Sequence, residues 1–170
     1  MNILERFKKI RTFIFDVDGV LTNGELIIFE DGSLVRKMNV RDGYAMKWAL
    51  QQKYQIAIIT GGSSKGVTER LRLLGIEDIY TGVQNKKEAY ADFLAKKQVR
   101  EENILYMGDD IPDYEVMRRV GFPTCPQDAA PEILEISQYV SPFEGGAGCV
   151  RDVIEKVMRI NGKWMDERDD

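Results

Sequence analysis

Short apolar runs alternate along the chain with segments of helical hydrophobic spacing. Runs rich in β-branched and aromatic residues, typical of buried strands, lie at 12–16, 56–60, 103–110, 122–125 and 138–140. Helical spacing follows at roughly 43–53, 64–74, 86–97, 112–119 and 148–160. The alternation predicts an α/β fold, a Rossmann-like, doubly wound parallel sheet with helices on both faces. A mixed α+β domain is the alternative.

One segment departs from this alternation. Residues 25–40 form two β-like arms around Asp31-Gly32, a dipeptide typical of tight hairpin turns. We therefore expect an antiparallel hairpin, or flap, between the first strand and the first helix. Its arms are too apolar for an unpartnered protrusion, so the hairpin either forms an interface or folds back onto its own domain.

The remaining pattern predicts one domain. Residues 1–170 contain no linker, repeat or insert large enough for a separate cap domain. The polar tail at about 161–170 is expected to be loose, although Trp164 and Met165 could dock.

Composition narrows the classes of function. The 170 residues carry a net charge of −4 without a basic block, which disfavours nucleic acid and anionic membranes as partners. The chain has no histidine, which removes histidine bases, catalytic triads and histidine-bound metals. Cys125 and Cys149 have no CxxC partner, so a reduced compartment is the simpler interpretation, with a disulfide left open. No signal segment or membrane-length apolar run is present, and we expect a cytoplasmic protein.

Polar residues follow three of the predicted strands. Asp16 and Asp18 end the first, Thr60 the second, and Asp109 and Asp110 the third. If these strands are neighbours, the side chains converge in one crevice at the carboxyl edge of the sheet. Asp16 and Asp18 point the same way in an extended chain, and their like charges require a cation or a shared proton. Oxygen ligands without nitrogen or sulfur donors select magnesium.

Two predicted helix starts offer groups for an anion. The glycines of TGGSS (60–64) allow close backbone approach, while a helix cap at Ser63 or Ser64 is the structural alternative. Lys86 or Lys87 is a candidate to hold phosphate charge, with a solvated surface lysine as the alternative. A carboxylate nucleophile, magnesium, a hydroxyl and a lysine together indicate phosphoryl transfer through an aspartyl-phosphate. A second aspartate would protonate the leaving alcohol and then activate water.

These motifs resemble those of the haloacid dehalogenase superfamily of phosphatases. The matching segments, in chain order, are DVDGV (16–20), TGG (60–62), Lys86 and GDDIPD (108–113). The resemblance implies four catalytic residues: Asp16 as nucleophile, Asp18 as general acid/base, and Thr60 and Lys86 as phosphate ligands. It also implies a magnesium site formed by Asp16, the backbone carbonyl of Asp18 and Asp109, with support from Asp110 and Asp113.

Longer segments resemble the 3-deoxy-D-manno-octulosonate 8-phosphate phosphatase subfamily. They are NVRDGYAMKWAL (39–50), GDDIPDYEVM (108–117) and GGAGCVRDVIEKV (145–157). The resemblance implies that the substrate is this phosphorylated 2-keto-3-deoxy sugar acid. It further implies a homotetramer without separate caps, in which the hairpins form a barrel and neighbouring subunits supply the lid. The candidate substrate-binding residues are Asn39, Val40, Arg41, Asp42, Gly43, Lys47, Gly61, Gly62 and Arg70.

Two positions depart from the subfamily pattern. Gly62 stands where the octulosonate enzymes typically have arginine, and Ala147 where they often have another. A nine-carbon ulosonate 9-phosphate or another sugar phosphate is therefore the alternative substrate. Two remoter alternatives are a non-catalytic oligomerisation domain, like those fused to sialic-acid cytidylyltransferases, and a phosphotransferase or mutase.

Overall fold

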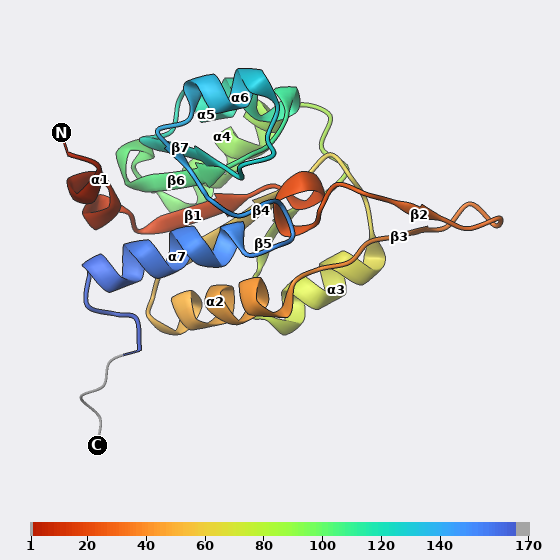
Figure 1. The fold of residues 1–170 in the computed structure, drawn as a ribbon, viewed down its shortest axis with the longest axis horizontal. Coiled ribbons are helices and arrows are strands. Elements are labelled where there is room, and N and C mark those ends of the chain that lie inside the picture. Colours follow the sequence, from red (N-terminus) through yellow and green to blue (C-terminus); the bar gives the residue numbers. More distant parts are fainter. Residues whose placement is uncertain (1, 166–170) are drawn as a thin grey trace.

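The computed structural model describes residues 2–165, which form a parallel sheet between two layers of helices (Figure 1). Within this range the strands lie in the order β5-β4-β1-β6-β7-β8, and each neighbouring pair is parallel. Their bounds are β1 (Thr12–Phe15), β4 (Gln55–Ile59), β5 (Asp78–Tyr80), β6 (Ile104–Met107), β7 (Phe122–Cys125) and β8 (Tyr139–Val140). The prediction of a doubly wound parallel sheet is confirmed.

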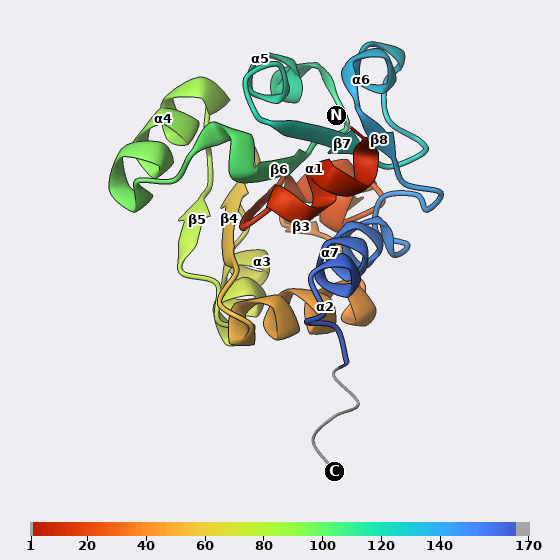
Figure 2. The same ribbon diagram turned by 90° about the vertical axis from the view of Figure 1, so that its left-hand side faces the viewer.

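Helices cover both faces of the sheet (Figure 2). One face carries α1 (Ile3–Lys9), α2 (Val40–Gln51), α3 (Lys65–Leu73) and α7 (Cys149–Ile160). The other carries α4 (Lys86–Lys97), α5 (Tyr114–Met117) and α6 (Pro131–Ile136). The hydrophobic spacing does not predict α1, β5 and α6, because such short elements contain too little periodicity. In residues 2–165 no helix combines the length and apolar character needed to cross a membrane.

The central strand β1 is buried on both faces. Phe13 and Phe15 belong to the core beneath α2 and α7, whereas Ile14 points into the core beneath α4. Strand residues alternate between faces, so a strand covered on both sides needs an unbroken apolar run. This burial explains the run at 12–15 and makes the polar change at Asp16 abrupt.

The predicted hairpin is present and projects beyond the carboxyl edge of the sheet (Figure 1). Its strands β2 (Ile27–Ile28) and β3 (Leu34–Val35) are antiparallel. Asp31 stabilises the turn by accepting hydrogen bonds from the Ser33 amide and hydroxyl. Among the described residues nothing covers the apolar side chains of the hairpin, and those exposed are Leu26, Ile27, Ile28, Phe29, Leu34 and Val35.

The chain after α7 packs back onto the domain. The indole N–H of Trp48 donates to the Lys163 carbonyl oxygen at 2.9 Å, and Trp164 is only 7% exposed. Of the two residues for which the sequence left docking open, Trp164 is buried, because its aromatic ring supplies apolar area, and Met165 is exposed. Residues 166–170 lie outside the described range.

Asp42 joins α2 to the beginning of α7. The α7 N-cap is Gly148, which has no side chain to accept a hydrogen bond from the first turn. Asp42 supplies the acceptor instead, since its Oδ1 lies 2.9 Å from the Arg151 amide nitrogen. The carboxyl group is 1% exposed and its Oδ2 has no hydrogen-bond partner among the described residues. Burial raises the pKa of Asp42 to about 6.

We predict that this raised pKa makes the stability contributed by Asp42 dependent on pH. The folded pKa exceeds the ordinary value of 3.8, so the contribution is present below pH 3.8 and is lost as pH rises through about 6. The free energy of unfolding of the wild type, relative to Asp42→Asn, should fall by up to about 3 kcal/mol between pH 4 and 7. Urea unfolding at both pH values measures this difference. Glu135→Gln, at an exposed position of α6, is the control, and a pH-independent difference for Asp42→Asn would contradict the prediction.

Candidate active site

A cavity of about 390 Å³ lies at the carboxyl ends of β1, β4 and β6. The register of the three neighbouring strands places their last residues side by side, as the sequence pattern predicts. The structure brings together around this cavity the candidate residues Asp16, Asp18, Thr60, Gly61, Gly62, Lys86, Asp109, Asp110 and Asp113.

The turn after β1 sets the positions of two carboxylates. Asp16 accepts a hydrogen bond from the Val17 amide at 2.7 Å, and the chain then enters the tight turn Val17–Leu21. Gly19 in this turn has φ +88°, a conformation that residues with a Cβ rarely adopt. A Cβ at this position would also overlap the carboxylate of Asp109. Gly19 thus admits Asp109 to the site, besides turning the chain.

Lys86 lies in a buried charge network at the start of α4. Its Nζ is 3.0 Å from Asp16 Oδ1 and 2.7 Å from Asp113 Oδ1, and the residue is 6% exposed. The hydroxyl of Tyr106 donates to the same Asp113 oxygen at 2.6 Å. The alternative of a solvated surface lysine applies to Lys87, which is exposed, and does not apply to Lys86.

Asp113 and Asp110, the two supporting aspartates of the segment GDDIPD (108–113), have different surroundings. Asp113 is fully buried and also accepts a hydrogen bond from the Asp109 amide at 3.1 Å. Asp110 is exposed, and its Oδ1 accepts from the Ile111 amide at 2.8 Å, which begins the 3₁₀ turn Ile111–Asp113. Asp113 therefore orients Lys86 and the loop that carries Asp109, while Asp110 holds the turn.

Electrostatic repulsion in this group is strong. Oxygen atoms of Asp16, Asp109 and Asp113 all lie within 4.8 Å of one another. Burial, and then the charges of Asp16 and Asp113, raise the pKa of Asp109 to about 8. Burial and the charge of Asp113 raise the pKa of Asp16 to about 6, although Lys86 acts in the opposite direction. One lysine does not balance the three carboxylates.

The donor set fits a magnesium ion. Carboxylate oxygens in a compact group are the ligands that Mg²⁺ takes in proteins, and a divalent charge would relieve the repulsion at Asp109. Asp113 is already engaged by Lys86 and Tyr106, so Asp16 and Asp109 are the side chains left to hold the ion. These are the two carboxylate ligands that the sequence motifs imply.

The loop after β4 offers a hydroxyl and an open backbone. Thr60 is buried, and its Oγ1 accepts from the Gly62 amide at 3.2 Å, which leaves the hydroxyl proton to donate into the cavity. Ser64 caps α3 by accepting from the Val67 amide. Ser64, and not Ser63, is therefore the helix cap.

Arg36 is the site residue that sequence reasoning misses. Its Nε donates to Asp18 Oδ1 at 2.7 Å and its Nη2 to Asp18 Oδ2 at 3.2 Å. Arg36 follows β3, 18 residues after Asp18, and belongs to none of the matching segments, so no motif links it to the site. The one signal in the sequence is Gly62, which stands where the subfamily typically has arginine. In the structure, the Arg36 guanidinium lies beside Gly62 and Asp18.

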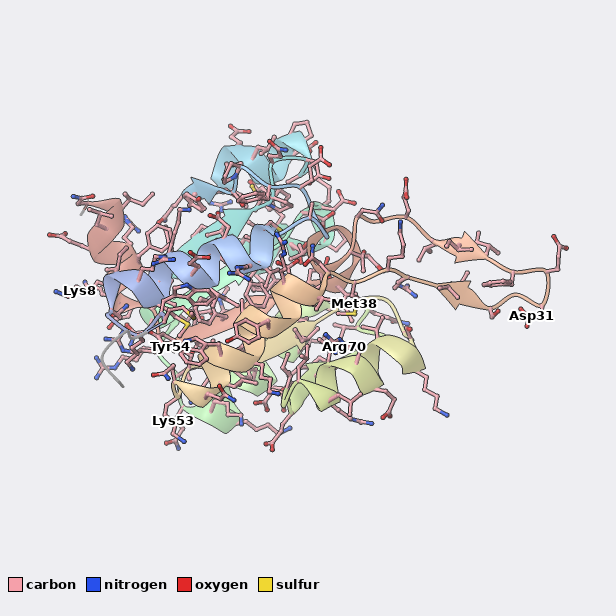
Figure 3. The ribbon with its side chains drawn as sticks, turned by 60° about the horizontal axis from the view of Figure 1, so that its bottom comes forward. Lys8, Asp31, Met38, Lys53, Tyr54 and Arg70 are labelled. Carbon is pink, nitrogen blue, oxygen red and sulfur yellow. The ribbon has the colours of Figure 1, made fainter. Side chains whose placement is uncertain are left out.

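The remaining candidate residues lie outside this cavity. Asn39 caps α2, and Asn39, Val40 and Arg41 line a separate hollow of about 1010 Å³ beside α7. Asp42 and Gly43 are buried, and Gly43 admits the guanidinium of Arg70 against α2. Lys47 is exposed on α2. Arg70 lines a third cavity of about 300 Å³ at the base of the hairpin, close to Met38 and far from the tip at Asp31 (Figure 3).

Comparisons with known proteins give the family of the chain. A family model described as haloacid dehalogenase-like hydrolase matches residues 43–126. The chain is 39% identical over 166 residues to 3-deoxy-D-manno-octulosonate 8-phosphate phosphatase KdsC of Escherichia coli K12, covering 98% of this chain and 88% of the relative. The crystal structure of the phosphatase of that name from Yersinia pestis has a TM-score of 0.92 and 36% identity, covering 95% of this chain and 87% of the other.

A second solved structure bears on the cofactor. The Moraxella catarrhalis 3-deoxy-D-manno-octulosonate 8-phosphate phosphatase, in complex with magnesium, phosphate and KDO, has a TM-score of 0.90 and 32% identity. The match covers 94% of this chain and 92% of that one.

The parallel sheet with its cluster of carboxylates and a buried lysine is that of a phosphoryl-transfer hydrolase, and the chain belongs to the haloacid dehalogenase-like hydrolases. Within this family it belongs to the group of phosphatases that includes these relatives. Magnesium is the cofactor of this class, and the Asp16–Asp109 pair fits it.

We predict that magnesium binding releases a proton and strengthens with pH. With its pKa near 8, Asp109 is mostly protonated at pH 6.5, and the ion must displace that proton. The affinity should rise by up to about tenfold per pH unit below pH 8. Isothermal titration calorimetry in buffers of different ionisation enthalpy measures the affinity for magnesium and the number of protons released. Equal affinity at pH 6.5 and 8.5 would contradict the prediction, and Asp109→Asn should remove the pH dependence.

Proposed function

We propose that the protein hydrolyses 3-deoxy-D-manno-octulosonate 8-phosphate to KDO and phosphate. The observation that carries this proposal is the 39% identity over nearly the whole chain to an enzyme of that name, together with the buried Asp16–Lys86–Asp113 network. The network argues against a purely structural role, because a buried charge cluster around a cavity is costly to maintain without a ligand.

The proposed reaction passes through an aspartyl-phosphate. An oxygen of Asp16 bonds to phosphorus while the bond from phosphorus to the sugar oxygen breaks, and Asp18 gives a proton to that oxygen. Asp18 then takes a proton from water, whose oxygen attacks phosphorus and frees Asp16 and phosphate. Lys86 and the Thr60 hydroxyl hold the phosphoryl oxygens. Magnesium, when bound, offsets the negative charge between the phosphoryl group and Asp16.

The neighbouring cavities support a substrate with a second charged end. Thr60 and Gly62 line both the catalytic cavity and a small cavity, which shares Arg36 and Ser64 with the third cavity near Arg70. Arg70 is half-buried and forms no ion pair with an acidic residue of the described chain. The small cavity, at about 10 Å³, is too small to hold part of a sugar. We propose that Arg70 binds the carboxylate of a sugar acid whose phosphate lies in the catalytic cavity.

The departure at Gly62 is compatible with an acidic substrate. A Cβ at position 62 would lie 3.0 Å from Arg36 Nη2, so a guanidinium, here paired with Asp18, lies beside the position where the subfamily typically has arginine. Ala147 lines the separate hollow beside α7 and lies outside the catalytic cavity. These placements are compatible with an acidic sugar phosphate, and the octulosonate is proposed on the sequence identity to its phosphatases.

We also propose that the protein is a homotetramer and acts in the cytoplasm. The exposed apolar hairpin supports an interface, since a patch of this kind rarely stays uncovered. Hairpins of several subunits would pack together, and a neighbouring subunit would cover each catalytic cavity. Two free, buried cysteines support a reducing compartment.

We predict that Asp16→Asn lowers kcat by a factor on the order of 10⁴ or more, because an amide does not replace a carboxylate nucleophile. The assay measures the rate of phosphate release. The substrates are the octulosonate 8-phosphate, a nine-carbon ulosonate 9-phosphate and hexose phosphates, each with and without Mg²⁺. Asp92→Asn on exposed α4 is the matched control. Turnover of the octulosonate ester no faster than that of hexose phosphates would refute the substrate, and full activity of Asp16→Asn would refute the covalent route.

We predict that a charge on the hairpin dissociates the tetramer. Ile28 is 71% exposed, and Ile28→Asp would bury an unpaired carboxylate in the proposed interface. The mass measured by sedimentation equilibrium should fall from four times the 19.5 kDa of one chain to that of a monomer. Leu73→Asp is the matched control, because Leu73 is 80% exposed but lies on α3, outside the hairpin. A monomeric wild type would contradict the proposed assembly.

A further inference from the structure

Arg36 brings a buried guanidinium to the edge of the active site. Its side chain is 5% exposed, and it contacts both carboxylate oxygens of Asp18, at 2.7 Å from Nε and 3.2 Å from Nη2. Arg36 directly follows β3, so the return strand of the hairpin carries it. This pair links the projecting hairpin to the side chain proposed as general acid/base.

Gly62 provides the space for this pair. A Cβ at position 62 would lie 3.0 Å from Arg36 Nη2 and 3.0 Å from Asp18 Oδ2, tighter than ordinary van der Waals contact. The backbone of Gly62 is outside the left-handed region, so its conformation does not demand glycine. Glycine at this position therefore serves the contact between the two side chains.

Stability alone gives a poor account of the pair. The pair is only partly buried, since the Asp18 side chain is 35% exposed, and an ion pair of this kind contributes little net free energy, because desolvation and solvent screening offset the attraction. Arg36 Nη1 is also buried without a hydrogen-bond partner in residues 2–165, which adds a cost. A costly contact on a reactive carboxylate is the arrangement expected when the orientation of that carboxylate matters to the chemistry.

We propose that Arg36 is the positioning residue for Asp18. This inference rests on the proposed function. The short contact to Oδ1 holds one rotamer of Asp18, whose side chain is otherwise 35% exposed, and the longer contact leaves Oδ2 to exchange a proton. Arg36 does not line the cavity that holds the carboxylate cluster, so it acts through Asp18 and is not itself a catalytic residue.

The test compares two esters that differ in their need for an acid. Arg36→Gln should lower kcat for 3-deoxy-D-manno-octulosonate 8-phosphate by about tenfold or more, because the sugar oxygen must be protonated to leave. The loss for p-nitrophenyl phosphate should be much smaller, since p-nitrophenolate leaves without a proton. KM should change little for either ester. Lys37→Gln is the matched control, because it also removes one positive charge and Lys37, the next residue of the chain, is exposed.

Two further variants test the contact itself. Arg36→Lys retains a single hydrogen bond to Asp18 and should recover part of the lost kcat for the sugar ester. Gly62→Ala should reproduce part of the selective loss, because its methyl carbon would lie 3.0 Å from both Arg36 Nη2 and Asp18 Oδ2 and the contact must shift to admit it. The kcat of the double variant Gly62→Ala, Arg36→Gln for the sugar ester should be no lower than that of Arg36→Gln, since both substitutions act on the same contact.

Several results would overturn the proposal. Equal losses of kcat for both esters would indicate general damage, and a raised KM with unchanged kcat would indicate that Arg36 binds substrate. If the wild type hydrolyses neither ester, the proposed function fails, and thermal unfolding then tests the pair. Asp18→Asn and Arg36→Gln should shift Tm non-additively when combined, and additive shifts would exclude a coupled pair.

Discussion

The structure of the active site depends on the repulsion among buried carboxylates at the carboxyl edge of the sheet. Asp16, Asp109 and Asp113 are brought within a few ångströms of one another, with Lys86 between two of them. Asp113 is satisfied by Lys86 and Tyr106, which leaves Asp16 and Asp109 with charge that only a cation or protons can offset. Burial, together with this imbalance, raises the pKa values of Asp16 and Asp109, and the imbalance makes the site a place for magnesium and a phosphoryl group.

Missing side chains shape this site as much as charged ones. Gly19 leaves room for the Asp109 carboxylate, Gly108 for Asp113, and Gly62 for the contact between Arg36 and Asp18. A Cβ at any of these positions would meet a side chain that the chemistry uses. The three glycines come from three different segments, each following a central strand, so the sheet register aligns the spaces as well as the carboxylates.

The hairpin connects two properties of the molecule. Its outer part exposes apolar side chains of the kind that pair with another chain, while its return strand ends in Arg36 at Asp18. Under the proposed tetramer, packing of the outer part would restrain the strand that carries Arg36. Assembly and the orientation of the acid/base side chain would then depend on one element.

The sequence by itself determined the class of fold and the reaction centre, because strand burial and the motifs after each strand are local patterns. The doubly wound sheet, the hairpin and the residues Asp16, Thr60, Lys86 and Asp109 all follow from it. Only the tertiary structure showed that Asp42 caps α7, that Trp164 is buried and that Arg36 holds Asp18. Each of these contacts joins residues that lie apart in the chain, and no local spacing encodes such a pairing.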